Sequence, residues 1–415
     1  MKLLVIGSGG REHAIVWKLL QNENIQKIYV APGNAGTETM EKTENINLSD
    51  IDSLLNFAKG NKIDLTILGS EELLVAGIVD KFQAEGLKIF GPHQRAAMLE
   101  GSKTFSKDFM KKHGVKTAEY ENFDNYDKAY AYLDKCEYPL VIKASGLAAG
   151  KGVIIAQNRV EAEEALKDIM LDSKFGQAGA EVVIEEFLEG VEASILSFYD
   201  GNIIVPFVSA KDHKKIGEGE TGLNTGGMGV IAPNPYVTTE VNELFIKDIL
   251  EPTLRGLKAE NLEFAGVIFF GLMITKNGVY SLEYNMRMGD PETQAVLPLL
   301  ENDYLDLILH AIEGGLDMVE VKWKNKHSAC VVMAAGGYPE NYNKGDIIEG
   351  LDKVENLVFI AGAKNEKGIR TNGGRVLNLV ALGDTLEDAR EIAYKDIKNI
   401  KFQGAYYRKD IGAIK

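Results

Sequence analysis

The first hundred residues alternate short apolar runs with amphipathic stretches. The apolar runs have the length of buried strands, and the stretches between them place apolar residues at helical spacing. The expected strands are 3–6, 27–30, 65–68 and 89–90, and the expected helices are 12–21, 51–59 and 73–85. Strands that alternate with helices in this way form an open parallel sheet. The pattern therefore predicts an α/β domain over residues 1–102.

A different pattern begins near Pro139, where strands follow one another with fewer helices between them. The expected strands are 140–144, 153–156, 182–187, 193–199 and 203–208, and the expected helices are 102–113, 160–171 and 239–260. Residues 211–229 are polar and rich in glycine, which predicts a long loop. Two further strands flank a turn at Asn277-Gly278. We assign residues 103–316 to a second domain.

The last hundred residues have the pattern of a small α+β unit. Strands are expected at 329–334 and 376–382, and a helix at 385–397. We assign residues 317–415 to this third domain. The chain as a whole is expected to be an α/β (α+β) protein of three domains, which agrees with the two to four domains that 415 residues allow.

Composition and charge narrow the class of protein. Acidic residues outnumber basic ones by 61 to 46, a net charge of −15, so we expect binding to neither nucleic acid nor membrane. Cys136 and Cys330 are far apart, which argues against a disulfide framework and a cysteine zinc site. The most apolar stretch, Phe264–Ile274, is about half as long as a membrane span, and the first residues do not resemble a signal peptide. We expect a cytoplasmic protein.

Glycine is over-represented, with 43 residues where average usage predicts about 29. Its first cluster, Gly7-Ser8-Gly9-Gly10-Arg11-Glu12, connects the first strand to a helix, a position that favours anions. Glu12 stands where a dinucleotide fingerprint needs glycine, and the second strand ends in another small-residue loop, 31–37, instead of a ribose-binding acid. We interpret the two loops as the site of one phosphorylated sugar. The alternative is a tight turn without a ligand.

A second cluster, residues 143–152, has Lys143 at the end of a strand and Lys151 within a flexible loop. The spacing is not that of a Walker A motif, but small residues let backbone N–H groups approach phosphate while the lysines neutralise its charge. Downstream, 185–188 and Glu192 are typical of an adenosine clamp, although alone they also suit a solvated acidic edge.

The third signal is Glu283-Tyr284-Asn285 at the end of an expected strand. Residues two apart in a strand point to the same face. A carboxylate and an amide oxygen placed together are suitable ligands for magnesium between nucleotide phosphates. The three signals in this order indicate a nucleotide site more strongly than any one of them.

These residues carry a resemblance to the ATP-grasp superfamily, whose ATP site has the order Gly101-Ser102-Lys103, Lys143 with its loop, Glu185…Glu192 and Glu283-x-Asn285. More narrowly, the chain resembles the phosphoribosylamine–glycine ligase (glycinamide ribonucleotide synthetase) family. The matching motifs are G-S-G-G-R-E-H-A, A-P-G-N-A-G-T, G-L-A-A-G-K-G-V, N-T-G-G-M-G and G-D-P-E-T-Q-A-V-L-P. T-N-G-G-R-V at 371–376 and a Y-R-K-D-I-G-like tail extend the match to about residue 412.

The resemblance implies an ATP-dependent carbon–nitrogen ligase of de novo purine biosynthesis. ATP would phosphorylate the carboxylate of glycine, and the amine of 5-phosphoribosylamine would attack the glycyl phosphate, giving glycinamide ribonucleotide, ADP and phosphate. Such chemistry needs positioning and charge neutralisation, and a lid at about 120–192 would exclude water. The implied cofactor is Mg²⁺ or Mn²⁺. We expect a monomer that makes transient contact with the enzyme producing 5-phosphoribosylamine.

The same resemblance implies the residues of the nucleotide site. The two lysines would hold phosphates, the 146–152 loop would close over them, and the 185–192 segment would frame adenine and ribose. The implied ATP-binding residues are Lys103, Lys143, Gly146, Gly150, Lys151, Gly152, Glu185, Phe187, Leu188 and Glu192. The implied metal ligands are Glu283 and Asn285.

The substrate residues follow likewise. The implied substrate-binding residues are Gly9, Gly10, Arg11, Glu12, Asn34, Gly36, Thr37, His213, Asn224, Gly226, Gly227, Glu292 and Thr293, and the implied catalytic residues are Arg287, Asp212, Lys214 and Asp290. The planar fork of Arg287 suits an acyl phosphate or a carboxylate. For Asp290 the alternative is a cap on a helix that begins near Pro291. Without the family, the 211–229 segment is most simply a solvated loop.

The chain also departs from the family pattern, at Ser70, Ser145, Val191, Met288 and Gly336. Phe269-Phe270-Gly271 lacks the acid that many ATP-grasp enzymes have there, which leaves the ligands of a second metal open. Two alternatives compete with the synthetase. One is another ATP-grasp ligase or carboxylase, against which the 34–37 and 212–214 motifs argue. The other is a silent nucleotide-binding regulator, which the retained charged residues make less attractive.

Overall fold

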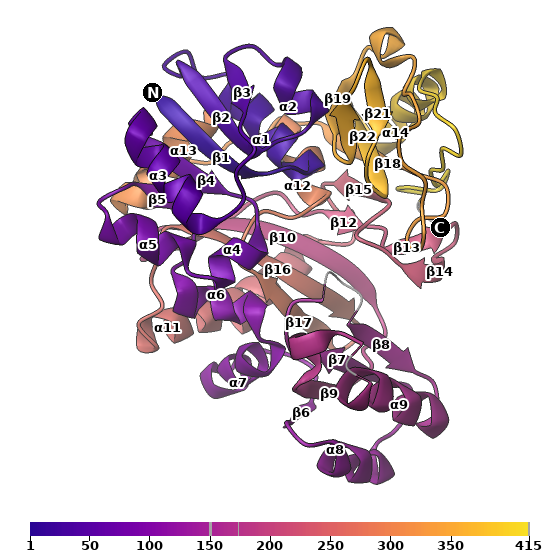
Figure 1. Ribbon diagram of the computed structural model, residues 1–415. Coiled ribbons are helices and arrows are strands. Elements are labelled where there is room, and N and C mark those ends of the chain that lie inside the picture. Colours follow the sequence, from indigo (N-terminus) through magenta and orange to yellow (C-terminus); the bar gives the residue numbers. More distant parts are fainter. Residues whose placement is uncertain (149–151, 173, 414–415) are drawn as a thin grey trace.

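A sheet of parallel strands forms the first unit, and β1 is apolar on both faces because helices cover it on each side. In the computed structural model, which describes residues 1–148, 152–172 and 174–413, its strand order is β3-β2-β1-β4-β5 (Figure 1). The strands are β1 (Lys2–Gly7), β2 (Lys27–Pro32), β3 (Thr43–Asn45), β4 (Leu65–Leu68) and β5 (Ile89–Phe90). The helices are α1 (Gly10–Leu19), α2 (Ala35–Thr39), α3 (Ile51–Asn61), α4 (Glu71–Val75), α5 (Ile78–Ala84) and α6 (Gln94–Gly101). The predicted open parallel sheet is confirmed.

Two details of this unit differ from the sequence pattern. The edge strand β3 is short and polar, so the pattern of apolar runs does not predict it. The single helix expected over 73–85 is two helices, because Gly77 between them has a φ of 84°, a left-handed conformation that glycine adopts without strain. Helix α6, absent from the prediction, leads directly into the next unit.

The middle of the molecule is an antiparallel sheet with the order β11-β10-β16-β17. Its strands are β10 (Val191–Tyr199), β11 (Ile204–Pro206), β16 (Gly266–Thr275) and β17 (Gly278–Asn285). The helices of this region are α7 (Lys103–His113), α10 (Thr239–Phe245), α11 (Glu251–Ala259), α12 (Glu292–Val296) and α13 (Tyr304–Glu313). Ser102 begins α7 by accepting a hydrogen bond from the amide of Phe105. Helix α7 packs against β17 of this sheet.

A smaller sheet with the order β6-β9-β7-β8 projects from this body, at the bottom of the view in Figure 1. It contains β6 (Tyr120–Phe123), β7 (Leu140–Ala144), β8 (Val153–Ala156) and β9 (Val182–Glu186), with α8 (Tyr126–Tyr132) and α9 (Arg159–Leu166). The unit has its own apolar cluster of buried side chains. The expected helix 160–171 becomes a π-helical turn over its last part, Lys167–Leu171.

The C-terminal sheet takes two of its strands from the middle of the chain. Its order is β12-β15-β18-β22-β19, with β12 (Lys211–Asp212), β15 (Gly229–Ala232), β18 (His327–Ala334), β19 (Leu357–Ile360) and β22 (Arg375–Gly383). Nearby are the hairpins β13 (Lys215–Gly217)–β14 (Thr221–Asn224) and β20 (Ala363–Asn365)–β21 (Ile369–Thr371), and helix α14 (Leu386–Asp396). The loop predicted over 211–229 is therefore wrong in part: β12 pairs with β15, and β13 and β14 form a hairpin. β15 in turn pairs with β18, about a hundred residues further along.

In the parts of the chain that the structure describes, none of the helices has the length and apolar character of a membrane span.

Candidate active site

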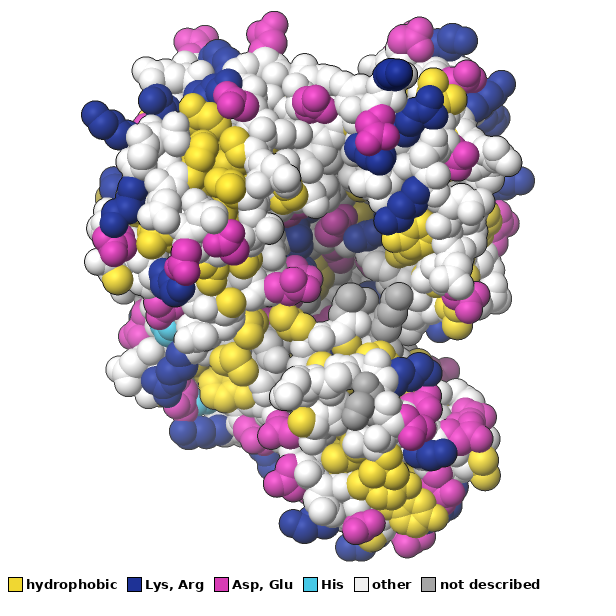
Figure 2. Space-filling model, viewed as in Figure 1, with side chains coloured by type: hydrophobic (Ala, Val, Ile, Leu, Met, Phe, Trp, Pro, Cys, Tyr) yellow, Lys and Arg dark blue, Asp and Glu magenta, His cyan; other side chains and the backbone are white. Residues whose placement is uncertain are grey.

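A hollow lies at the centre of the face shown in Figure 2, and both basic and acidic side chains gather in it. Glu283, near the end of β17, has several cations around it. Burial alone would raise the pKa of Glu283, but Lys214, Lys143, Lys103 and Arg287 together lower it. These cations come from different segments of the chain, so the fold gathers the positive charge that the sequence scatters.

The first glycine loop is shaped by contacts within the protein. Gly9 precedes α1, and its amide donates to Glu12 Oε2 at 2.6 Å, while Glu12 Oε1 lies 2.6 Å from Arg11 Nε. Glu12 is only 1% exposed, so it fixes the arginine beside it. A Cβ on Gly10 would lie 2.3 Å from the side-chain nitrogen of Asn378, which explains this glycine by packing.

The second glycine loop, residues 31–37, connects the first sheet to the C-terminal sheet through hydrogen bonds. The side chain of Asn34 accepts from the amides of Gly36 and Thr37, and it donates to the carbonyls of Ser8 and Ile360 at 2.9 and 2.8 Å. Thr37 is fully buried, and Gly36 packs against the ring of His13. In this structure these predicted sugar-binding residues shape the loop. Their contact with a ligand stays a prediction.

Two arginines of different units meet at one carbonyl. Arg11 Nη1 and Arg287 Nη1 both donate to the oxygen of Met288, at 3.0 and 3.2 Å. Arg287 Nη2 lies 2.9 Å from Glu100, and its Nε lies 3.4 Å from Glu71, which also faces Arg11 at 3.8 Å. The arrangement holds two guanidinium groups side by side without losing their charge, so it suits an anion with several oxygens.

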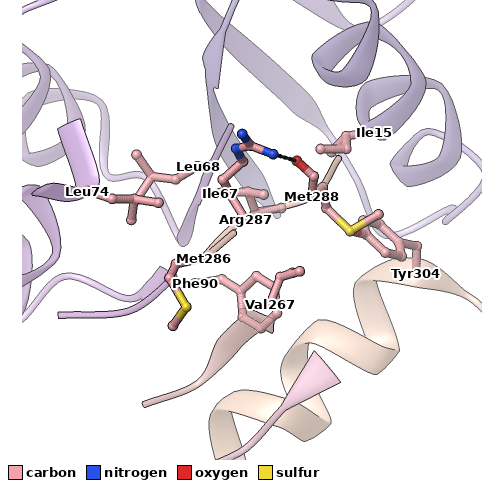
Figure 3. Close-up of a pocket in the computed structure, with 11 residues that line it drawn as sticks. Ile15, Ile67, Leu68, Leu74, Phe90, Val267, Met286, Arg287, Met288 and Tyr304 are labelled. Carbon is pink, nitrogen blue, oxygen red and sulfur yellow. Dashed lines mark hydrogen bonds between the residues drawn. The ribbon is translucent and has the colours of Figure 1, made fainter. Parts of the chain in front are cut away.

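An apolar pocket lies next to this network. Ile15, Ile67, Phe90 and Met286 are among the residues that line it, and Figure 3 shows the Arg287 guanidinium at one edge of it, bonded to Met288. Phosphorylated substrates need several polar partners, whereas apart from Arg287 this lining is almost entirely apolar. The pocket is a packing seam between the first sheet and the central sheet, and it supports the backbone of the arginine.

Lysines dominate the other side of the hollow. Lys143 forms an ion pair with Glu185 Oε1, and Lys107 Nζ lies 2.6 Å from Glu185 Oε2. Lys103, at the start of α7, donates from Nζ to the carbonyl of Gly146 at 3.1 Å. Burial, partly offset by Glu283, lowers the pKa of Lys103. Lys107 was not among the residues predicted from the sequence.

The loop after β7 borders these lysines. The amide of Gly146 donates to the carbonyl of Ala178, and a Cβ on Gly146 would lie 2.7 Å from the backbone of that residue. The carbonyl of Gly152 accepts from the amide of Ala144 at 2.8 Å. Gly150 and Lys151, both predicted to bind ATP, lie outside the described residues.

The predicted adenosine clamp lies where the small sheet joins the central one. Residues 187–190 connect β9 to β10, and Phe187 there is 38% exposed while Leu188 is half-buried. Glu192 lies 2.7 Å from Lys214, and this carboxylate raises the pKa of the lysine. An exposed apolar edge with a carboxylate a few residues away is able to take a base and a ribose.

Glu283 and Asn285 lie two residues apart on β17, as the strand pattern predicts. Gly271 is the register partner of Glu283, so no carboxylate stands opposite it, and within residues 1–148, 152–172 and 174–413 no three His, Cys, Asp or Glu residues gather closely enough to hold a metal. Two protein oxygens with one charge fit a divalent ion that takes its remaining ligands from phosphates and water.

Two carboxylates share the substrate side. Burial and the neighbouring Glu292 raise the pKa of Asp212 well above its usual range. The pKa of Glu292 is also raised by burial, although Ser194 donates to its Oε1 at 3.1 Å. A Cβ on Gly227 would lie 2.6 Å from Asp212, which explains the glycine by close approach. Because burial makes both carboxyl groups hold a proton more tightly than usual, the pair is suited to take one up.

Arg375 on β22 joins the glycine-rich segment to Asp290. Its Nη1 donates to the carbonyls of Gly226 and Asp290 at 2.5 and 3.0 Å, and its Nη2 lies 3.4 Å from Asp290 Oδ2. The sequence predicts no role for Arg375, although this residue lies in the T-N-G-G-R-V motif. The helix cap proposed for Asp290 is wrong: α12 begins at Glu292, and Asp290 Oδ1 accepts from the side chain of Gln294 instead.

The remaining predicted residues make bonds within the protein. His213 Nδ1 donates to the carbonyl of Gly229, its Nε2 accepts from the amide of Gly412, and burial lowers its pKa to about 4. Thr293 is fully buried and donates to the carbonyl of Gly289. Asn224 pairs with β13 at the end of β14. Whether these residues touch a substrate stays a prediction.

Comparison with known proteins places the chain in a family. Models of phosphoribosylglycinamide synthetase match residues 1–100 (N domain), 101–293 (ATP-grasp (A) domain) and 328–414 (C domain). Phosphoribosylamine–glycine ligase from Fusobacterium nucleatum is 60% identical, over 100% of this chain and 99% of that protein. The chain belongs to the phosphoribosylglycinamide synthetase family.

Other members of the synthetase family agree. The ligase of the same name from Clostridium acetobutylicum is 56% identical over the full length of both chains. The crystal structure of phosphoribosylamine–glycine ligase from Thermotoga maritima is 33% identical, covers 99% of this chain and 100% of its own, and has a TM-score of 0.88. The predicted family, fold class and carbon–nitrogen ligase class are confirmed, and ATP with a divalent metal is general to this ATP-grasp family.

Proposed function

We propose that this chain joins glycine to 5-phosphoribosylamine in the ATP-dependent reaction of de novo purine biosynthesis. ATP phosphorylates the carboxylate of glycine, the amine of 5-phosphoribosylamine attacks the glycyl phosphate, and glycinamide ribonucleotide, ADP and phosphate leave. The observation that carries the proposal is the 60% identity to a phosphoribosylamine–glycine ligase along the whole chain. The division of the hollow into a lysine side and an arginine side supports it.

On the nucleotide side, the predicted residues have separate tasks. Lys103 and Lys143 neutralise the phosphates, while Phe187 and Leu188 frame adenine and Glu192 takes the ribose. Glu283 and Asn285 hold the divalent metal, for which we propose Mg²⁺ or Mn²⁺. When bound there, the metal supplies charge neutralisation for the transferred phosphoryl group.

On the substrate side, the guanidinium groups of Arg11 and Arg287 bind phosphate or carboxylate oxygens. The amine loses a proton when it becomes an amide, and the pair Asp212 and Glu292 is placed to receive it. Asp290, fixed by Arg375, orients the amine. The loops 9–12, 34–37 and 224–227 enclose the sugar phosphate and glycine.

The proposal extends to organisation. We propose domain boundaries at 102/103 and 316/317, a lid over about 120–192, a monomeric enzyme and a cytoplasmic location. Transfer of 5-phosphoribosylamine by direct contact with the enzyme that makes it belongs to the same proposal. Gel filtration with light scattering tests the monomer, and a dimer at micromolar concentration would contradict it.

Product identification tests the reaction itself. The purified chain, with labelled glycine, ATP, magnesium and freshly made 5-phosphoribosylamine, should give labelled glycinamide ribonucleotide and equal amounts of ADP and phosphate. Omission of either glycine or the amine should stop product formation. ADP release that depends on bicarbonate instead of glycine would favour another ATP-grasp ligase, and nucleotide binding without any turnover would favour a regulator.

A further inference from the structure

Helix α7 carries a lysine whose ammonium group is withheld from both solvent and the hollow. Lys107 is 2% exposed, and its Nζ lies 2.6 Å from Glu185 Oε2. Nζ also donates to Thr117 Oγ1 at 2.7 Å and lies 5.7 Å from the centre of the Tyr120 ring. These contacts surround the ammonium group, so Lys107 is not placed to contact a nucleotide directly.

The other oxygen of the Glu185 carboxylate pairs with a second lysine. Lys143 pairs with Glu185 Oε1, and both side chains are buried. Burial alone would raise the pKa of Glu185, but Lys143 and Lys107 outweigh it and lower the pKa. One buried carboxylate therefore has two buried counter-ions, and the group of three carries one net positive charge.

The two lysines differ in what they have to do. Lys143 is the residue at the end of β7 to which we assign the ATP phosphates, so its ammonium group has to turn towards them. If Lys143 were the only partner of Glu185, that movement would leave a buried carboxylate without a counter-ion, which is strongly unfavourable. Lys107 keeps Glu185 neutralised while Lys143 is engaged with phosphate.

We infer that Lys107 is a positioning residue of the ATP site, acting as the permanent counter-ion of Glu185 and so releasing Lys143 to the phosphates. The inference rests on the proposed function, because it takes Lys143 as a phosphate ligand. Lys107 follows Lys103 by four residues, so the two lie on the same face of α7. Thr117 also donates to the carbonyl of Ser281 at 2.7 Å, two residues from the proposed metal ligand Glu283.

The test is Lys107→Met. This variant keeps Glu185 and Lys143 as a balanced pair, so the melting temperature should change by only a few degrees. Affinity for magnesium and ATPγS, measured by calorimetry, should fall about tenfold or more, and KM for ATP should rise by the same factor with kcat changed much less. Lys107→Arg should recover most of the affinity. Lys111→Met, at an exposed position one turn further on the same helix, is the matched control and should behave like the wild type.

A double-variant cycle tests whether Lys107 acts on Lys143 through Glu185. In a Glu185→Gln background no carboxylate competes for Lys143, so adding Lys107→Met should change ATPγS affinity by about twofold or less. An equal loss from Lys107→Met in both backgrounds would overturn the inference. So would normal ATPγS binding by the single variant, or a fall in melting temperature large enough to account for the lost activity. If the wild type itself neither binds ATPγS nor forms product, the proposed function fails instead.

Discussion

The cations on the two sides of the hollow are held in different ways. On the nucleotide side, Lys143 pairs with one carboxylate, Glu185. Lys214, which faces Asp212 as well, pairs with Glu192. On the substrate side, Arg287 alone contacts Glu71, Glu100, Asn285 and the carbonyl of Met288. A flexible ammonium with one partner is able to exchange it for a phosphate, whereas a guanidinium with several partners stays in place. The nucleotide side is therefore built for exchange and the substrate side for fixed geometry.

The largest effect is expected where the two sides meet. Glu283→Gln keeps an oxygen on β17 but removes the charge that faces lysines on one side and Arg287 on the other. Magnesium-dependent kcat should fall on the order of a thousandfold or more while circular dichroism shows a folded protein. Glu251→Gln, at an exposed helical position, is the control. Near-normal turnover would contradict the assignment of Glu283 as a metal ligand.

A pair of matched exchanges tests the comparison directly. Arg287→Lys keeps the charge but loses the fork, and one ammonium group reaches only part of the Glu100, Asn285 and Met288 set. We expect kcat/KM for 5-phosphoribosylamine to fall about a hundredfold, with a lower melting temperature. Lys103→Arg should cost about tenfold or less, seen as a higher KM for ATP. Equal losses in both variants would end the distinction between the two sides.

Replacing a carboxylate of the Asp212 and Glu292 pair should lower activity but raise stability. The pKa of Asp212 in the folded protein is raised, so the stability contributed by its protonated form is present below its unfolded pKa and lost as pH rises through the folded one. Asp212→Asn mimics the protonated form. We expect it to lower kcat about tenfold and to raise the melting temperature on the order of a few degrees at pH 8, with little gain near pH 4.

The control for Asp212→Asn is Asp124→Asn, at an exposed position, which should alter neither kcat nor the melting temperature. A variant Asp212→Asn that is less stable at every pH would mean that the charge of Asp212 stabilises the fold. That result would contradict the buried, mutually repelling pair described above.

The smallest effect on turnover is expected at His213. Its pKa of about 4 lies below the unfolded value of about 6.5, so between these values only the unfolded chain binds the proton. The free energy of unfolding should decrease as pH falls through this window, by about 1.4 kcal/mol per pH unit for this group. His213→Gln should flatten the slope and change kcat about threefold or less.

The activity of this variant distinguishes a structural role of His213 from direct contact with a substrate. Because both ring nitrogens bond to the backbone of Gly229 and Gly412, we expect the ring to hold β12 against the C-terminal tail. A loss of turnover beyond about tenfold in His213→Gln, with an unchanged melting temperature, would instead support the substrate contact that the sequence suggested.

Local signals predicted most of the elements, and their failures have identifiable causes. The strands at 65–68, 89–90, 140–144 and 153–156 have the predicted bounds because apolar runs flanked by breakers are a local property. The segment 211–229 has the pattern of a loop because its strands are short and polar. β13 and β14 pair only with each other, and β12 is held by β15, which itself pairs with the distant strand β18. Such short strands, and pairing with a distant strand, leave no apolar periodicity in the segment itself.

The candidate site divides in the same way. Glu283 and Asn285 were predicted together because alternation along a strand places them on one face. Arg375 and Lys107 have no role that the sequence predicts, because their partners are remote: the carbonyl of Gly226 is 149 residues from the arginine, and Glu185, the partner of Lys107 on α7, lies on β9. A basic residue on a strand or helix is ordinary until its partner is known.

By itself, the sequence determined the family, the reaction class, the parallel sheet and the order of the ATP-site motifs, since each is read from short motifs or from the local alternation of apolar and polar residues. The tertiary structure decided which charges meet. It placed two lysines on Glu185, two arginines on one carbonyl, and the strands of a central segment in the C-terminal sheet. The physical reason is that electrostatic pairing and burial act through space, between groups whose separation along the chain carries no record of their distance.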